Sequence, residues 1–264
     1  MRRRDVLVLG SGLALAGTMP GLARAGGIEL LKAGQISAAT EGTYPPFSFK
    51  NASGELDGIE IRTMREVCKR IGVTHVAVET KWDSMLVGLL ADQWDLCSDT
   101  MAITEERKKK VWFCDGWMMG GARLVVQNSS AIKTNADAKG KTVGTLVASI
   151  YIPLVDKLGA TLKAYQSDVE ALQDLANGKI DAMITDGTAA AFSIKTGNLP
   201  LRMTDEVMAP SQNGWPVKKG KKELVMAINK AMDDIRSEGL FKAICMEFIG
   251  IDLTPKDPVR SDFS

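Results

Sequence analysis

The chain has 264 residues, of which 45% are hydrophobic and 25% charged, a composition typical of a globular protein with one large domain or two small ones. The formal net charge of +1 provides no basic field for nucleic acid, and no apolar run reaches the ~20 residues that span a bilayer. The single histidine, His75, argues against a Ser-His-Asp triad and against a multi-histidine metal centre. We expect no cofactor, because the chain shows no metal-ligand spacing, and its one short Gly-x-Gly segment near the start, residues 10–12, belongs to the predicted export signal rather than to a phosphate loop.

The first 25 residues have the pattern of an export signal. Arg2, Arg3 and Arg4 form a positive head, residues 6–19 are mildly apolar, and residues 23–25 (Ala-Arg-Ala) offer a cleavage site. We therefore expect an exported protein of the periplasm, and the adjacent arginines leave the twin-arginine route open. The alternative, a buried N-terminal helix, is disfavoured because no amphipathic face accompanies the arginines.

Export changes the interpretation of the cysteines, since disulfides form and persist in oxidising compartments. The chain has four cysteines, and their spacing matches no zinc pattern. Two alternatives remain open, disulfide pairing and buried free thiols, for Cys68, Cys97, Cys114 and Cys245.

Strands and helices alternate over the first hundred residues after this segment. Apolar residues at helical spacing predict a helix over 59–71 that Gly72 ends, and a shorter helix is expected over 84–91. Strands are expected within 36–49 and at 74–78, 95–97, 111–113 and 124–127. Such alternation is typical of a mostly parallel sheet with helices on its faces.

The same alternation restarts after Asn128. Strands are expected at 141–146, 161–165, 180–184, 199–203 and 215–218, and helices at 150–158, 168–177, 188–195, 222–237 and 241–248. The pattern predicts two α/β lobes, the first made of residues 26–126 and 216–264 and the second of residues 127–215. Two chain crossings, near 125–128 and 212–217, would then leave a cleft able to open and close by a hinge.

Four segments carry a family resemblance. They are Gly42-Thr-Tyr-Pro-Pro-Phe-Ser-Phe49 with the turn up to Gly58, Thr100-Met-Ala-Ile-Thr-Glu-Glu-Arg-Lys-Lys-Lys-Val-Trp-Phe113, Lys141-Thr-Val-Gly144, and Gly178-Lys-Ile-Asp-Ala-Met-Ile-Thr-Asp186. In this order, over residues 36–250, they resemble the extracellular solute-binding proteins of the polar amino acid transporter class. The resemblance implies a two-lobe periplasmic binding protein type II fold that closes on a small amino acid or carboxylated solute. It also implies a monomer that docks transiently on a membrane ABC permease, with no nucleic acid partner.

Two charged residues match the positions at which this family holds the backbone of an amino acid. Arg107 has a planar guanidinium that is always charged and can bind both oxygens of a carboxylate. The alternative is that Arg107, within the basic run 107–110, is only a solvent-exposed charge. Asp186 follows an apolar strand, where its carboxylate would enter the crevice and pair with an ammonium. It is also a candidate N-cap of the next helix, and both roles can hold.

Further positions follow from the same resemblance. Tyr44 and Trp82 match the aromatic residues that clamp the ligand side chain, although core packing is the alternative. Ser149 falls where a hydroxyl and a backbone N–H meet the carboxylate, unless it only caps a helix. Thr100 is also expected at the ligand, and Thr104 is expected to cap the helix that bears Arg107.

One departure from the family pattern bears on the ligand. Ala102 stands where the family usually has Ser or Thr, so one hydroxyl donor to the ligand carboxylate is missing. Glu41 and Asp99 align near the pocket rim and could face a cationic side chain of the ligand. The alternative is that both are solvent-exposed acidic residues with no role in binding.

Two other functions remain open beside a transport receptor. Some relatives are dehydratases of cyclic dienyl acids, and a desolvated Glu41 or Asp99 could serve as their general acid. A periplasmic sensor or accessory binding protein is the other. We expect no catalysis, because the chain retains Asp186, the carboxylate with which a pure binding protein would pair the ligand ammonium.

Overall fold

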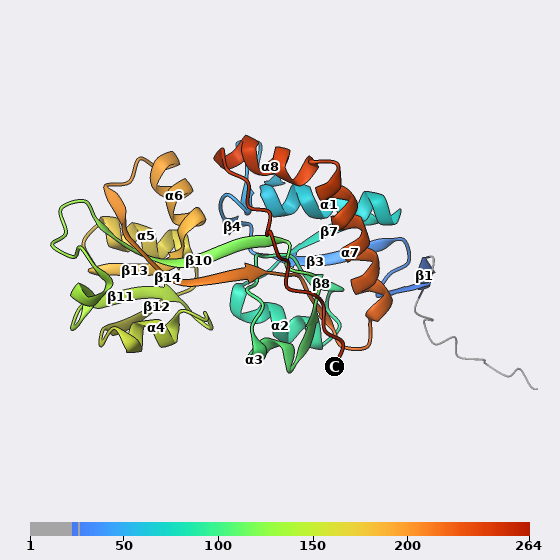
Figure 1. The fold of residues 1–264 in the computed structure, drawn as a ribbon, viewed down its shortest axis with the longest axis horizontal. Coiled ribbons are helices and arrows are strands. Elements are labelled where there is room, and N and C mark those ends of the chain that lie inside the picture. The colour runs from blue at the N-terminus through green and yellow to red at the C-terminus, as the bar shows by residue number, and fades with distance from the viewer. Residues whose placement is uncertain (1–22, 26) are drawn as a thin grey trace, which may run out of the picture.

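Two five-stranded sheets, each covered by helices, form the cores of two lobes that lie side by side along the longest axis of the molecule (Figure 1). The structure is a computed structural model that describes residues 23–25 and 27–264. The predicted export signal lies outside the described residues except for β1 (Ala23–Ala25), which pairs with β2 (Ile28–Leu30). Within this described part of the chain, no helix is long and apolar enough to cross a membrane.

The first sheet has the strand order β7-β3-β8-β15-β9. Its parallel part is the pairing of β3 with β7 and β8, and β15 then runs antiparallel to both β8 and β9. The strands are β3 (Gln35–Thr40), β7 (Thr74–Glu79), β8 (Leu96–Cys97), β9 (Val111–Phe113) and β15 (Pro216–Lys218). A small separate sheet beside it contains β4 (Thr43–Tyr44), β5 (Ser48–Lys50) and β6 (Leu56–Asp57).

Helices from both ends of the chain cover this first sheet. In α1 (Ile59–Ile71) the apolar residues at helical spacing are buried, and Gly72 ends the helix with φ 82°, a conformation that favours glycine. Residues of α7 (Lys222–Ser237) and α8 (Leu240–Ile249) share one apolar cluster with α1. The helices α7 and α8, near the end of the chain, therefore pack on the first sheet. The first lobe also contains α2 (Trp82–Leu90) and α3 (Glu105–Lys108).

The second sheet has the order β12-β11-β13-β10-β14 and is parallel where β11 joins β12 and β13. Its strands are β10 (Met118–Gln127), β11 (Thr142–Leu146), β12 (Thr161–Tyr165), β13 (Ala182–Asp186) and β14 (Leu201–Asn213). The helices of this lobe are a 3-10 turn (Asn135–Ala138), α4 (Ile152–Lys157), α5 (Asp168–Ala176) and α6 (Gly187–Thr196).

The long antiparallel strands β10 and β14 carry the chain from one lobe to the other (Figure 1). The crossing expected at 125–128 lies inside the second sheet, because Val125 pairs with Met183 there. The chain instead enters this sheet through residues 118–121, which have no pattern typical of a strand. Trp117 and Trp215, which flank the two crossing strands, stack at 4.8 Å in the core of the first lobe.

Residues 251–264 form a strap that leaves α8 and passes over both crossing strands (dark red in Figure 1). The N–H of Met119 donates to the carbonyl of Leu253 at 2.9 Å, and that of Gly116 to the carbonyl of Val259 at 2.7 Å. The Gln212 side chain on β14 donates to the carbonyl of Asp257 and accepts from the N–H of Val259, both at 2.8 Å. The strap thus adds hydrogen bonds to both strands at the crossing.

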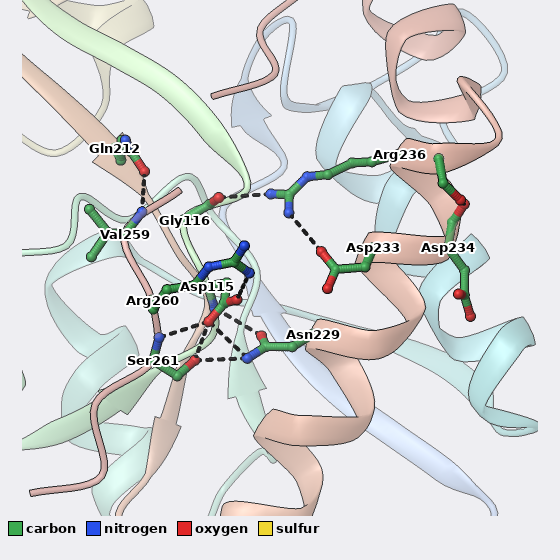
Figure 2. A network of polar contacts seen from close by, with 11 residues as sticks. Asp115, Gly116, Gln212, Asn229, Asp233, Asp234, Arg236, Val259, Arg260 and Ser261 are labelled. Atoms are coloured by element: carbon green, nitrogen blue, oxygen red, sulfur yellow. Dashed lines mark hydrogen bonds and ion pairs between the residues drawn. The ribbon is translucent and has the colours of Figure 1, made fainter. Parts of the chain in front are cut away.

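Asp115 anchors the strap to the first lobe (Figure 2). Its carboxylate accepts from the N–H and hydroxyl of Ser261 at 2.7 and 2.8 Å and from Arg260 at 2.6 Å. Asn229 on α7 donates to both Asp115 and Ser261. Burial disfavours the charge of Asp115, but these hydrogen bonds outweigh burial and hold its pKa below its ordinary value.

All four cysteines are buried free thiols, which resolves the two alternatives left open by the sequence. Burial raises the pKa of Cys68 and of Cys245 to about 12, so both are protonated at neutral pH.

Candidate functional site between the lobes

Residues of both lobes line one cavity, and all eight residues expected at the ligand from the sequence lie on its wall. The first lobe contributes Glu41, Tyr44, Trp82, Thr100, Ala102 and Arg107. The second contributes Thr145, Leu146, Ser149, Ile150, Tyr151, Asp168, Ile184, Thr185 and Asp186, and Asn213 comes from the end of β14. Whether these residues bind ligand remains a prediction.

The cavity lies at the carboxyl ends of parallel strands from both sheets. Glu41 directly follows β3, Asp99 follows β8, and Asp186 ends β13. Ligands of open α/β sheets bind in crevices outside these strand ends. The same position in each lobe therefore supplies polar groups to one shared space.

Two hydrogen bonds and an aromatic ring hold Arg107 of α3 at the cavity wall. The hydroxyl of Thr104 caps this helix by accepting from the N–H of Arg107 at 3.2 Å, as predicted. One guanidinium nitrogen donates to the carbonyl of Ala102 at 3.0 Å, and the guanidinium lies 5.3 Å from the centre of the Trp82 ring. Burial lowers the pKa of Arg107 to about 10, so it stays charged at neutral pH.

Asp186 caps α6, as the sequence predicts, and also lies on the cavity wall, whereas its pairing with an ammonium remains a prediction. Its Oδ1 accepts from the N–H groups of Thr188 and Ala189 at the start of α6, and its Oδ2 accepts from the N–H of Gly121 at 2.9 Å. Burial raises its pKa although these hydrogen bonds oppose the shift. A Cβ on Gly120 would lie 3.0 Å from Oδ2 and 2.8 Å from the amide nitrogen of Asn213, so only glycine leaves both side chains in place.

Two tyrosines and a serine complete the wall near Asp186. Burial raises the pKa of Tyr44 and of Tyr151 well above the ordinary range, so both rings present neutral hydroxyls. The Tyr44 ring contacts Phe47 at 5.5 Å and thus also packs in the first lobe. The hydroxyl of Ser149 accepts from the N–H of Tyr151 at 3.1 Å, but it does not cap α4, whose N-cap residue is Tyr151 and which has no side-chain cap.

The acidic wall of the cavity is desolvated. Burial and the neighbouring Asp99 and Asp168 raise the pKa of Glu41 to about 10. Burial also raises the pKa of Asp99 and that of Asp168 to about 7. Asp99 lies directly behind Glu41, whose N–H donates to Asp99 Oδ2 at 2.6 Å.

Thr100 sits in an unusual backbone conformation, with φ 37°. Its N–H donates to the buried carboxylate of Glu60 at 2.6 Å, and the indole N–H of Trp215 donates to the other oxygen of Glu60 at 2.6 Å. The buried Thr100 hydroxyl finds no partner within the described part of the chain. The Thr100 hydroxyl is therefore free at the cavity wall. Through Glu60, the backbone of Thr100 is also linked to Trp215, which follows the crossing strand β14.

Five polar residues of the wall were not expected from the sequence: Thr145, Tyr151, Asp168, Thr185 and Asn213. Asp168 had a usable signal, because it follows the carboxyl end of a parallel strand just as Asp186 does. A carboxylate in the first turn of a helix is also favoured by the helix dipole, so this signal alone does not assign Asp168 to the cavity. Tyr151 and Asn213 carried no such signal.

The lobes also touch each other beside the cavity. Phe49 on β5 and Phe192 on α6 lie 6.2 Å apart, and Ala189 of α6 joins the apolar core of the first lobe. No cluster of metal-ligating residues is found within residues 27–264. The fold and cavity are those of a two-lobe α/β protein with one polar cavity between its lobes.

The comparisons with known proteins agree with this class. The family model of bacterial extracellular solute-binding proteins, family 3, matches residues 36–251, and the chain belongs to this family. It is 33% identical over 225 residues to an L-cystine-binding protein, TcyJ, of Escherichia coli, covering 84% of this chain and 85% of the relative.

Two solved structures are similar to the whole two-lobe body. An ancestral arginine-binding protein bound to glutamine has a TM-score of 0.78 and 32% identity, covering 83% of this chain and 100% of the other. An ancestral amino acid-binding protein described as a precursor of cyclohexadienyl dehydratase has a TM-score of 0.77 and 27% identity, covering 82% and 96%.

Proposed function

We propose that the protein is a periplasmic receptor that captures an amino acid between its lobes and delivers it to an ABC permease. The family membership and the amino acid ligands named for its relatives support this proposal. The receptor acts as a monomer, because closure and docking need no second copy. The export signal over residues 1–25, with its adjacent arginines, directs it to the periplasm.

The observation that carries the proposal is the placement of opposite charges in one buried space. Arg107 on the first lobe and Asp186 on the second both line the cavity. An amino acid brings a carboxylate and an ammonium that must both be paired when water is removed. Arg107 takes the carboxylate and Asp186 the ammonium, so the ligand joins the lobes, with Thr100 and Ser149 beside it and Tyr44 and Trp82 against its side chain.

Replacing the arginine tests this role. In Arg107→Ala a ligand carboxylate is left unpaired, and affinity falls at least 100-fold, or about 3 kcal/mol. Isothermal calorimetry with the twenty amino acids and L-cystine identifies the ligand and measures the loss. Lys110→Ala, which removes an exposed positive charge near α3, is the matched control and keeps the affinity. Equal affinity of the Arg107→Ala protein would contradict the assignment.

A dehydratase is the second candidate, and Glu41 is the observation that favours it. Its raised pKa of about 10 keeps it protonated, as a general acid requires, and one structural neighbour is a dehydratase precursor. We propose binding without catalysis, because His75 on β7 lies outside the cavity wall and Asp186 lies on it, where a ligand ammonium can pair with its carboxylate.

Catalysis is tested by incubation with prephenate or arogenate, following aromatic product by absorbance. We expect no turnover. If the wild-type protein turns over one of these substrates and the folded Glu41→Gln protein does not, the protein is an enzyme and the proposed receptor function is wrong.

A further inference from the structure

The side chain of Gln212 on β14 binds the strap and takes no part in the cavity wall. Its amide nitrogen donates to the carbonyl of Asp257, and its amide oxygen accepts from the N–H of Val259, both at 2.8 Å (Figure 2). These two partners lie 45 and 47 positions later in the chain. A side chain at this position needs one donor and one acceptor to satisfy both partners, as an amide provides.

Gly116 leaves the space that this amide occupies. A Cβ on Gly116 would lie 2.3 Å from Oε1 of Gln212 and 3.3 Å from the backbone nitrogen of Val259. The φ of Gly116 lies outside the left-handed region, so close approach rather than backbone conformation explains the glycine. The position of the Gln212 side chain is therefore specified by a neighbour as well as by its hydrogen-bond partners.

The backbone around Gln212 holds a segment of the cavity wall. The carbonyl of Gln212 accepts from the N–H of Ile103 at 2.9 Å, and Asn213 forms an antiparallel bridge with Ala102. Ala102 and Asn213 both line the cavity. The carbonyl of Ala102 in turn accepts from the guanidinium of Arg107 at 3.0 Å. A continuous set of hydrogen bonds therefore joins the strap to the residue expected to bind the ligand carboxylate.

Adjacent residues of β14 serve the strap and the cavity separately. Side chains of neighbouring residues in a strand point to opposite faces, and here Gln212 contacts the strap while Asn213 lines the cavity. Asn213 is 5% exposed and closely confined, since a Cβ on Gly120 would lie 2.8 Å from its amide nitrogen. A shift of β14 away from the strap would therefore also move a residue of the wall.

We propose that Gln212 is a positioning residue for ligand binding, through which the strap holds the backbone of Ala102 and Asn213 in its binding position. The strap can do this because Asp115 anchors its far end to the first lobe (Figure 2). The inference rests on the proposed function, since it needs an amino acid in the cavity. Because Gln212 acts on the wall through the backbone, it changes the affinity of all bound amino acids by one common factor.

Gln212→Met tests this role, because it keeps the length of the side chain and removes both polar atoms. Calorimetry of the intact protein with the twenty amino acids and L-cystine should show each one that binds the wild type binding the variant about tenfold more weakly. The ligand must then order this backbone on binding, which costs free energy. Gln127→Met removes a side-chain hydrogen bond to the carbonyl of Ala176 in the second lobe. It is the matched control and should keep the affinity.

Two further changes break the contact without altering Gln212. Gly116→Ala places a methyl group where Oε1 of Gln212 lies, and deletion of residues 255–264 removes both partners of the amide. Each should weaken binding in the same direction as Gln212→Met. In the shortened chain, Gln212→Met should cause no further loss, because the strap partners of its side chain are already absent. Lys256→Ala, at an exposed strap position, is the control and should keep the affinity.

Thermal unfolding of each variant separates positioning from support of the fold. A contact that only supports the fold would lower the unfolding temperature of Gln212→Met and leave affinity at 25 °C unchanged, and this result would overturn the inference. A full additional loss from Gln212→Met in the shortened chain, or a loss confined to one class of amino acid, would also overturn it. Should the shortened chain not fold, Gly116→Ala takes its place in the same comparison. Failure of every amino acid to bind the wild-type protein overturns the proposed function itself.

Discussion

At the residue scale, Asp186 shows how one carboxylate can serve the fold and the cavity together. Three backbone N–H groups hold it, two at the start of α6 and one on β10. Its orientation is therefore fixed before any ligand arrives. A side chain held in this way loses little rotational freedom on binding, which favours affinity.

The two roles of Asp186 can be separated by substitution. Asp186→Asn keeps an oxygen for the helix cap, but it removes the charge and turns an NH₂ group toward the N–H of Gly121, so ligand affinity should fall more than tenfold while the cap of α6 persists. Asp186→Ala should lose affinity and, in addition, about 1 kcal/mol of stability from the lost cap. Thermal unfolding and calorimetry measure both quantities. Thr134→Ala, which removes a cap far from the cavity, is the control, and unchanged affinity in Asp186→Asn would contradict the ammonium role.

Five of the eight expected cavity residues stand within the segments that carry the family resemblance, whereas Glu41, Trp82 and Ser149 lie outside them. Arg107 and Asp186 stand within recognisable segments, and the cap by Thr104 follows from residue spacing alone. Asp168 could not be assigned in this way, because a carboxylate at the start of a helix has a sufficient local explanation. Only the meeting of the two lobes shows that it also faces Glu41.

At the scale of elements, amphipathic helices were predicted best. The bounds expected for α1 and α7 agree with the structure, since both bury one apolar stripe. The outer halves of β10 and β14 were missed. Gly120 and Gly121 and the polar residues after Met203 have weak strand preference, so their extended form depends on pairing with each other.

The strap gives a prediction at this scale. Asp115→Asn should destabilise the protein by about 1–3 kcal/mol at pH 7, because hydrogen bonds to a charged group are lost. The folded pKa of Asp115 is depressed, so its stabilisation is present above its ordinary pKa of 3.8 and disappears as pH falls through the folded value. The difference in the free energy of unfolding between Asp115→Asn and the wild-type protein should therefore shrink below pH 3.8. Chemical denaturation across pH measures it.

The control for the strap is Lys256→Ala, at an exposed strap position, which should leave stability unchanged. Gln212→Ala should lower stability in the same direction as Asp115→Asn, since it removes two hydrogen bonds to the strap. A stable Asp115→Asn protein at pH 7 would show that the strap is not held through this carboxylate.

At the scale of the whole molecule, the alternation of strands and helices was enough to predict two lobes and a return of the chain to the first. The location of the crossing was not, because it depends on which strands pair. We expect the bending points at residues 118–121 and 210–213, where β10 and β14 run between the sheets.

Ligand binding is expected to close the lobes about these strands. Small-angle scattering at saturating ligand should give a smaller radius of gyration than scattering without ligand. The Arg107→Ala protein under the same conditions is the control and should show no change. Identical curves for the wild-type protein with and without ligand would count against hinge closure.

The strap also bears on the order in which the molecule is assembled. The second sheet uses one continuous stretch of chain, residues 118–213, whereas the first lobe needs β15 and the helices that follow it. Residues 253–261 come later in the chain than every strand and helix of both lobes, yet they bond to Gly116, Met119 and Gln212 at the crossing. The joint between the lobes is therefore completed only after both of them have been synthesised.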